Sequence, residues 1–496
     1  MMLPDNKILA AVDIGSNSIH IVIARVVKGS LQIINSHRER TQLALGLGEE
    51  LLLTNAAMQR GWECLQRMAK LLSDAQPDQV RAVATYALRA AHNRDVFLEQ
   101  AEALLGYSIE VIAGREEARL IFQAIAHTEK IERESLVFDI GGGSTELAAG
   151  VGFDPQFRAS CAMGCVNYRE QFFSKGFTRE NFAQANRAAL QSLEAYLPQL
   201  GRREWHSVYA TSGSAKALAQ AAMQDEGTDA SVSLQQLLSL REKIIAHNGV
   251  SWLGELGISD SRTLLVPGGL AIMIACMQCL TIDRIYYRDV ALREGVLYEM
   301  LEQMRHPNIR VRTRKSMQSR YSTDTAHAER VTDTVSAILQ RVPAAWLGSK
   351  DDVHEILYEA AHLHEVGLQI SAGGLQKHSA YILASSDLPG YNEEQQLLLA
   401  SLVGAHRKKI RLDDLPKLRI IEPPALLRLI IVLRLAIIFN ITRWPIDLAY
   451  VELSVKPDGL HIVVDEKLIA TQQLLEADLQ RESDLLAAVN FNLIIR

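Results

Sequence analysis

The stretch FDIGGGSTEL, residues 138–147, combines two carboxylates with three consecutive glycines and two hydroxyls. Asp139 precedes the glycines and Glu146 follows the hydroxyls. Consecutive glycines let successive backbone N–H groups point at one anion, because no side chain obstructs its approach. The stretch therefore predicts a phosphate-binding turn whose donors are Gly141, Gly142, Gly143, Ser144 and Thr145.

A second turn of the same design lies near the N-terminus. In DIGSNS, residues 13–18, an aspartate is again followed by small and polar residues, with donors at Gly15, Ser16, Asn17 and Ser18. Either turn alone could be only a tight hairpin, but the recurrence favours phosphate. Because Asp13, Asp139 and Glu146 would repel phosphate, the pattern also predicts a divalent cation, and Mg²⁺ suits carboxylates with phosphate.

The elements that must position these turns are strands. ILAAVDIGSNSIHIVIA (residues 8–24) and SLVFDIGGGSTELAAG (residues 135–150) both read as apolar strand, turn and second strand, with β-branched residues on each side. Asp13 and Asp139 then occupy equivalent positions of an internal duplication. Since helices and strands alternate after each turn, we expect an α/β fold of two lobes with the ligand site in the cleft between them.

The rest of the chain changes character after Met304. Helical periodicity runs from about residue 323 to 440, and AYVELSVKPDGLHIVVD predicts a β-hairpin followed by a helix and a short strand. We therefore divide the chain into a first lobe, a second lobe, an all-helical domain and a small C-terminal α/β domain, at residues 1–122, 123–303, 304–440 and 441–496.

Composition places limits on partners and compartment. The chain has 496 residues and a net charge of -6, which argues against a surface built for nucleic acid. Five scattered cysteines and the absence of a signal-like N-terminus favour the reducing cytoplasm. The most apolar window, residues 425–439, contains Arg428 and Arg434 and predicts a core helix rather than a transmembrane segment, which leaves peripheral membrane association open. Cys276 and Cys279 are expected on a buried helix.

Seven segments together carry a family resemblance, namely DIGSNS, GREEARLIF, DIGGGSTEL, MGCV, TSGS, PGGLAI and ALREGVLYEM. In this order they resemble the motifs of the exopolyphosphatase and guanosine pentaphosphate phosphohydrolase (Ppx/GppA) family over nearly the whole chain. The resemblance implies the duplicated, ribonuclease H-like fold of actin, sugar kinases and Hsp70. It also implies Mg²⁺-dependent removal of a terminal phosphate, and a homodimer.

The resemblance also assigns site residues. Acids at a helix start are ordinarily explained by the helix dipole, but the second glutamate of GREEARLIF, Glu117, matches the family's general base. Asp139 and Glu146 match the acids that hold magnesium and the attacking water, and Arg89 matches a phosphate-binding arginine. Gly213 in TSGS is a weaker candidate for a nucleotide or distal phosphate contact. Two departures are Val290, where relatives usually have glycine, and Ser214, where threonine is usual.

The helical domain resembles an HD-type metal hydrolase fold. Histidines stand at His327, His364, His378 and His406, but Glu365 takes the place of the aspartate that such a metal site requires. We therefore prefer the interpretation that the histidines are core hydrogen-bonding residues, with a metal site as the alternative.

Basic residues gather near the start and in the middle of the helical domain. Such runs often serve solubility, but if both line a groove they would track a long polyanion electrostatically. Without interleaved aromatic residues they favour polyphosphate over single-stranded nucleic acid. The candidate track consists of Arg310, Arg312, Arg314, Lys315, Arg407, Lys408 and Lys409.

The sequence thus predicts a phosphoanhydride hydrolase. GGGST, HEVGL and KHSAYILASSDLPGY favour the exopolyphosphatase branch, acting on inorganic polyphosphate. The alternative is pppGpp hydrolysis in the stringent response, or both activities in one enzyme. A sensor that binds such ligands without turnover, and an ATP-dependent sugar kinase, remain as hypotheses of other classes. Intact Glu117, Asp139 and Glu146 argue against the sensor, and a water-activating Glu117 argues against the kinase.

Overall fold

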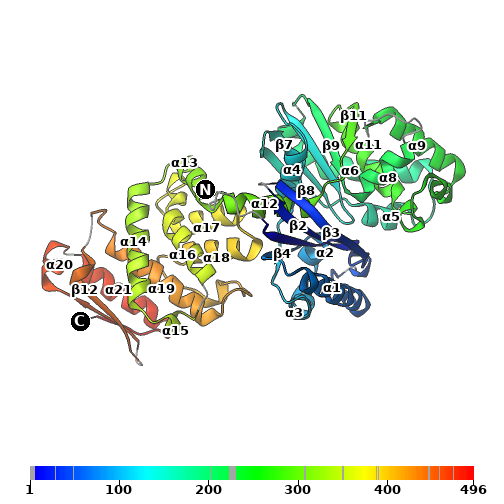
Figure 1. Cartoon of the computed structure of the whole chain (residues 1–496). Helices are drawn as coiled ribbons and strands as arrows, with labels where there is room; N and C mark the ends of the chain where they lie inside the picture. The colour runs from blue at the N-terminus through cyan, green and yellow to red at the C-terminus, as the bar shows by residue number, and fades with distance from the viewer. Residues whose placement is uncertain are drawn as a thin grey trace. The chain divides into compact units, whose positions relative to one another are not determined.

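The computed structural model describes residues 6–495 except 28–29, 49, 202, 223–230, 306–308, 349–350, 387, 389, 445–446, 457–458 and 473. The chain divides into two compact units, Met1–Pro307 and Asn308–Arg496 (Figure 1). The first unit contains two mixed α/β sheets, and the second is mainly helical with a small sheet near the C-terminus.

The first sheet has the order β3-β2-β1-β4-β5. β1, β2 and β3 form an antiparallel meander, and β4 and β5 are parallel to β1. The apolar runs of β1 and β2 are buried on both faces, which is why they read as continuous hydrophobic segments. The bounds are β1 Ile8–Ile14, β2 Ser18–Val27, β3 Ser30–Arg40, β4 Gln79–Ala84 and β5 Ile109–Val111.

The second sheet repeats this arrangement in the order β10-β11-β9-β6-β7-β8. β6, β7 and β8 form the meander, β9 and β11 continue in parallel from β6, and β10 adds an antiparallel edge. The predicted duplicated α/β fold is confirmed. The bounds are β6 Ser135–Ile140, β7 Thr145–Val151, β8 Asp154–Cys161, β9 Ser207–Thr211, β10 Ser231–Ser233 and β11 Arg284–Tyr287.

Two helices, α4 and α12, connect the sheets. α4 packs on β7 and β8 of the second sheet, and α12 packs on α4 and on β1 and β2 of the first. The helices meet closely at Gly295, where a Cβ would lie 2.1 Å from the carbonyl oxygen of Leu120. The helices of this unit are α1 Asn55–Ala75, α2 Tyr86–Ala90, α3 Arg94–Leu105, α4 Gly114–Thr128, α5 Cys165–Phe173, α6 Arg179–Leu193, α7 Leu197–Leu200, α8 Ser212–Ala222, α9 Leu234–His247, α10 Asp260–Thr263, α11 Val266–Cys279 and α12 Leu292–Arg305.

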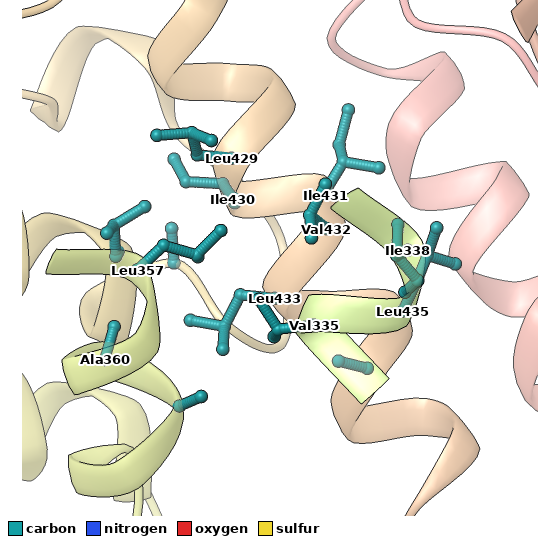
Figure 2. Packing of buried hydrophobic residues seen from close by; sticks show 14 of the residues in the cluster. Val335, Ile338, Leu357, Ala360, Leu429, Ile430, Ile431, Val432, Leu433 and Leu435 are labelled. Carbon is teal, nitrogen blue, oxygen red and sulfur yellow. The ribbon is translucent and has the colours of Figure 1, made fainter. Parts of the chain in front are cut away.

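The second unit is built around α19, the apolar segment that the sequence identifies as a core helix. Figure 2 shows apolar side chains of α19, from Leu429 to Leu433 and at Leu435, among side chains of α14 and α16 that include Val335 and Leu357. Among the described residues, no helix combines the length and apolarity needed to cross a bilayer. The helices are α13 Ile309–Arg320, α14 Thr325–Arg341, α15 Ala344–Leu347, α16 Asp351–Leu363, α17 Leu375–Ser385, α18 Glu393–Gly404, α19 Pro423–Phe439, α20 Glu466–Thr471 and α21 Leu475–Ala487.

The C-terminal sheet joins the same hydrophobic core. β12 (Val451–Lys456) and β13 (Gly459–Val464) form the expected hairpin, whose turn residues 457–458 lie outside the described residues, and β14 (Leu493–Ile495) is parallel to β13. Ile462 and Leu493 belong to the core cluster that contains Leu433. The boundary placed at residue 440 therefore falls within one continuous hydrophobic core.

A buried ion pair links α19 to α21. Arg434 is 1% exposed, and its guanidinium donates to both carboxylate oxygens of Glu482, at 2.5 and 2.7 Å, and to the carbonyl oxygen of Ala405 at 2.6 Å. A guanidinium buried in a helical core requires such a partner, since desolvating an unpaired charge is costly.

We expect Glu482→Ala to destabilise the second unit by about 3–5 kcal/mol, because it leaves the buried guanidinium without its counter-ion. Urea denaturation of the full chain, followed by circular dichroism, measures the loss. Arg481→Ala is the matched control on the same helix; its exposed pair with Asp478 should contribute less than about 1 kcal/mol. Equal midpoints for the two variants would contradict the role of the buried pair.

Candidate active site

A cavity of about 150 Å³ lies in the first unit where the two predicted turns meet. The turn after β1 lines it with Gly15, Ser16, Asn17 and Ser18, and the turn after β6 lines it with Gly141, Gly142 and Ser144. Both sheets thus contribute the ends of equivalent strands to one cavity.

The two turns have the same backbone hydrogen bond and approach each other directly. Gly15 N–H donates to the Ser18 carbonyl at 3.1 Å, and Gly141 N–H donates to the Ser144 carbonyl at 2.9 Å. A Cβ on Gly142 would lie 3.0 Å from the Cβ of Ser16. Glycine at position 142 is therefore what permits the turns to face each other so closely.

Two residues of the glycine-rich motif, Gly143 and Thr145, do not line the cavity, although the sequence predicts them as phosphate donors. The Thr145 hydroxyl donates to the Met163 carbonyl at 2.6 Å and the residue is fully buried, so this hydroxyl is not offered to the cavity. A Cβ on Gly143 would lie 2.1 Å from the Tyr86 ring, so this glycine makes room for an aromatic side chain.

Gly213 does line the cavity, at the start of α8, but its neighbour there is an arginine. A Cβ at position 213 would lie 1.6 Å from Nη1 of Arg262. Glycine here makes room for the Arg262 guanidinium at the cavity wall. The preceding residue, Ser212, has φ of 83°, an uncommon conformation for a residue with a side chain.

Four buried carboxyl groups gather at this site. Burial raises the pKa of Asp13 and of Glu117 to about 7 and that of Asp139 to about 6. Burial, with the nearby charges of Glu117 and Asp139, also raises the pKa of Glu146 well above its usual value. Asp13, Glu117 and Asp139 line the cavity, whereas Glu146 is not among the lining residues and is paired with Asp139 across β6 and β7.

Hydrogen bonds orient three of these carboxylates. Arg89 donates from Nη1 to Oε2 of Glu117 at 3.2 Å and to the Ile112 carbonyl at 2.8 Å. Thr211 Oγ1 donates to Oδ2 of Asp139 at 3.0 Å, and Ser160 Oγ donates to Oε1 of Glu146 at 2.8 Å. Arg89, predicted to bind phosphate, is thus placed beside the predicted base and is not among the residues lining the cavity.

Three arginines and a histidine at the cavity escaped sequence reasoning: Arg38, Arg262, Arg293 and His20. Burial, together with the charges of Arg262 and Arg293, lowers the pKa of Arg38 to about 10. Burial and the adjacent arginines lower the pKa of His20 to about 3, so its imidazole is neutral. Like-charged arginines held together in one hollow favour a polyanion. The arginines come from β3, α10 and α12; Arg293 lies within the ALREGVLYEM motif, whereas no motif marks Arg38 or Arg262.

The donor set fits a hard divalent cation. Oδ1 of Asp13 is buried without a hydrogen-bond partner, and the carboxylates around it repel one another. A cation bound by oxygen ligands would relieve both costs.

The two residues that depart from the family motifs lie in different surroundings. Ser214 lines the cavity, whereas Val290 packs against apolar side chains and its neighbour Ala291 lines the cavity.

The second unit has a cavity of about 420 Å³, lined in part by His327, His364, Glu365 and His406. Burial lowers the pKa of His327 to about 4 and depresses the pKa values of His364 and His406, so the rings are neutral near pH 7. The fourth histidine, His378, does not line this cavity, and its Nε2 lies 3.1 Å from the Gly373 carbonyl oxygen.

The basic residues of the proposed track lie in different environments: some form ion pairs, some are exposed, and some line a cavity. Arg310 pairs with Glu355 at 2.9 Å and Arg314 pairs with Glu359 at 3.1 Å, which offsets their charges. Lys315 and Lys409 are exposed, and the side chain of Arg312 lies outside the described residues. Arg407 and Lys408 line the cavity of the second unit, whereas Arg310, Arg314 and Lys315 do not.

Known proteins share sequence similarity with both units of this chain. Models of the Ppx/GppA phosphatase family and of Ppx/GppA phosphatase, domain III, match residues 22–304 and 309–483. A guanosine-5'-triphosphate,3'-diphosphate pyrophosphatase of Aliivibrio fischeri is 36% identical over 488 residues, covering 98% of this chain and 97% of the relative. The protein of the same name from Photobacterium profundum is 36% identical over 481 residues, covering 97% and 96%.

Solved structures agree in fold. The Ppx/GppA family member of Aquifex aeolicus is 26% identical with a TM-score of 0.53, over 60% of this chain and 99% of that one. An exopolyphosphatase from Cytophaga hutchinsonii, 22% identical over 60% of this chain and 98% of that one, has a TM-score of 0.56 and shares the fold. From its motifs, its duplicated sheets and these matches, the chain belongs to the Ppx/GppA phosphatase family.

Proposed function

We propose that this protein hydrolyses the terminal phosphoanhydride of pppGpp, giving ppGpp and orthophosphate. The observation that carries the proposal is the 36% identity, over 98% of the chain, to a relative named as a guanosine-5'-triphosphate,3'-diphosphate pyrophosphatase. The cavity supports it chemically, because paired anion-binding turns and three arginines suit a ligand with several phosphates.

Inorganic polyphosphate is the second candidate substrate. The cavity chemistry is common to both ligands, since each presents a terminal phosphate on a phosphoanhydride. Sequence motifs favour the exopolyphosphatase branch, but the Aliivibrio and Photobacterium relatives are both named as guanosine-5'-triphosphate,3'-diphosphate pyrophosphatases. In the second unit, the pairing of Arg310 and Arg314 with glutamates weakens the support for a polyphosphate track.

In the proposed mechanism, Glu117 accepts a proton from the attacking water. Its pKa of about 7 suits a general base at neutral pH, because enough carboxylate is present and it still binds a proton effectively. Arg89 fixes the orientation of the carboxylate. Backbone N–H groups of the two turns and the guanidinium groups of Arg262 and Arg293 offset the charge of the phosphates.

Asp13 and Asp139, with Glu146 paired to Asp139 on the neighbouring strand, would hold Mg²⁺. When bound, the ion neutralises phosphate charge and polarises the phosphoryl group. Thr211 and Ser160 keep Asp139 and Glu146 in position through the hydrogen bonds described above.

The substrate assignment predicts a higher kcat/KM for pppGpp than for long polyphosphate at equal enzyme concentration. Orthophosphate release with Mg²⁺ in parallel assays measures both values. A reversed order would return the assignment to exopolyphosphatase. If both ligands bind and neither releases orthophosphate, the enzyme assignment itself fails and the sensor hypothesis replaces it.

We expect Glu117→Gln to lower kcat about 100-fold or more, because the amide cannot accept the proton of water. Binding of pppGpp, measured by calorimetry, should change little, since the amide keeps the shape of the side chain. Glu132→Gln, an exposed glutamate just after α4, is the control and should keep the original rate. A Glu117→Gln variant with nearly unchanged kcat would remove this residue from the role.

Magnesium should stabilise the protein more strongly as the pH rises. The raised pKa values of Asp13 and Asp139 mean that bound protons stabilise the fold at low pH, and this contribution is lost as the pH rises through about 6 to 7. Mg²⁺ can replace the lost protons, so the increase in Tm on its addition should grow from about pH 5 to about pH 8.

Thermal unfolding with and without Mg²⁺ measures this difference, and comparison at each pH cancels the opposite pH dependence of His20. Asp139→Asn should reduce the Mg²⁺-dependent increase in Tm. An increase that is independent of pH would contradict the assignment of these carboxylates to the ion.

A further inference from the structure

The cavity of the second unit brings three ligand atoms together. His327, His364 and Glu365 each offer one nitrogen or oxygen atom, and these atoms lie within 4.8 Å of one another. A tetrahedral ion bonded at about 2.1 Å to each donor needs donors about 3.4 Å apart, so small side-chain rotations would close the site. His327 lies in the first turn of α14, and the other two residues directly follow α16.

His364 is held in the form that a metal ligand requires. Its Nδ1 lies 2.8 Å from the Ala361 carbonyl oxygen, so Nδ1–H donates there and Nε2 keeps its lone pair. Nε2 is buried, has no hydrogen-bond partner, and lies 4.0 Å from Oε1 of Glu365. A carbonyl that fixes one ring nitrogen and frees the other is the usual support of a metal-binding histidine.

His327 has the same unmet requirement. The residue is 3% exposed, its Nδ1 is buried without a partner, and its ring centroid lies 5.5 Å from that of His364. Two adjacent buried imidazoles with unpaired nitrogens are costly unless something binds them. The interpretation of these histidines as core hydrogen-bonding residues therefore accounts for Nδ1 of His364 but leaves both unpaired nitrogens unexplained.

Glu365 supplies the negative charge and is itself supported. Arg443 donates to its two oxygens at 2.9 and 2.6 Å and also to Asp324 at 3.3 Å. Each carboxylate oxygen retains a second lone pair, and ligating carboxylates are commonly hydrogen-bonded in this way. The positive charge of Arg443 opposes a nearby cation, but Asp324 offsets it.

We propose that His327, His364 and Glu365 bind a divalent transition-metal ion, Zn²⁺ or a chemically similar ion. Two imidazoles and one carboxylate favour such an ion over Mg²⁺, which prefers oxygen ligands. Three protein ligands leave a coordination position for water or an anion. Arg407 and Lys408, which line the same cavity, provide positive charge suited to an anion.

The test uses the full-length chain, freed of metal by a chelator and dialysed into buffer with excess Mg²⁺ to occupy the first unit. Zn²⁺ is titrated by calorimetry, and Co²⁺ is added separately to read its visible absorption, which reports nitrogen and oxygen ligation. We expect one equivalent of Zn²⁺ in the unaltered chain, and binding at least about tenfold weaker in His364→Gln and Glu365→Gln.

His378→Gln is the matched control, because this histidine belongs to the same unit but its Nε2 lies by the Gly373 carbonyl. It should keep the full equivalent and the Co²⁺ spectrum. Circular dichroism verifies that each variant is folded, and Glu365→Gln retains both histidines if His364→Gln does not fold. The proposal is overturned if the unaltered chain binds no Zn²⁺, or if Glu365→Gln binds it as tightly as the unaltered chain.

Discussion

The mutual repulsion of buried carboxylates is the constraint on which the candidate active site depends. Asp13, Glu117, Asp139 and Glu146 are taken out of water around one small cavity, and burial raises the pKa of each. Such a cluster destabilises the fold unless protons or a cation neutralise it. The surrounding hydrogen bonds hold these groups in place despite the repulsion, so the site is prepared for a charged ligand before one arrives.

The duplicated fold brings the carboxylates of this cluster together. Each sheet contributes one aspartate at the end of its first strand, so the same local design supplies both sides of the cavity. A buried ionic network then connects the lobes: Arg81 of β4 and Arg119 of α4 both donate to Glu299 of α12. Because α4 also carries Glu117, this network fixes the proposed general base relative to both sheets.

Sequence patterns determine the parts of this arrangement that are local. The strand–turn–strand units, the core helix α19 and the proximity of the two turns follow from periodicity and glycine content. The contributions of Arg38, Arg262 and Arg293 do not, because each reaches the cavity from a different element and only tertiary packing brings them together. The same reason explains Thr145 and Gly143, whose neighbours Met163 and Tyr86 are distant in sequence.

The two cavities differ in donor chemistry. The first presents carboxylates and backbone groups, which suit a hard ion with phosphate, whereas the second presents imidazole nitrogens with one carboxylate. The two proposed cation sites therefore differ in the ion that their ligand types favour. Because none of the residues His327, His364 and Glu365 lines the first cavity, removing an ion from the proposed second site would leave the proposed hydrolytic groups intact, and any effect on turnover would have to act through the fold.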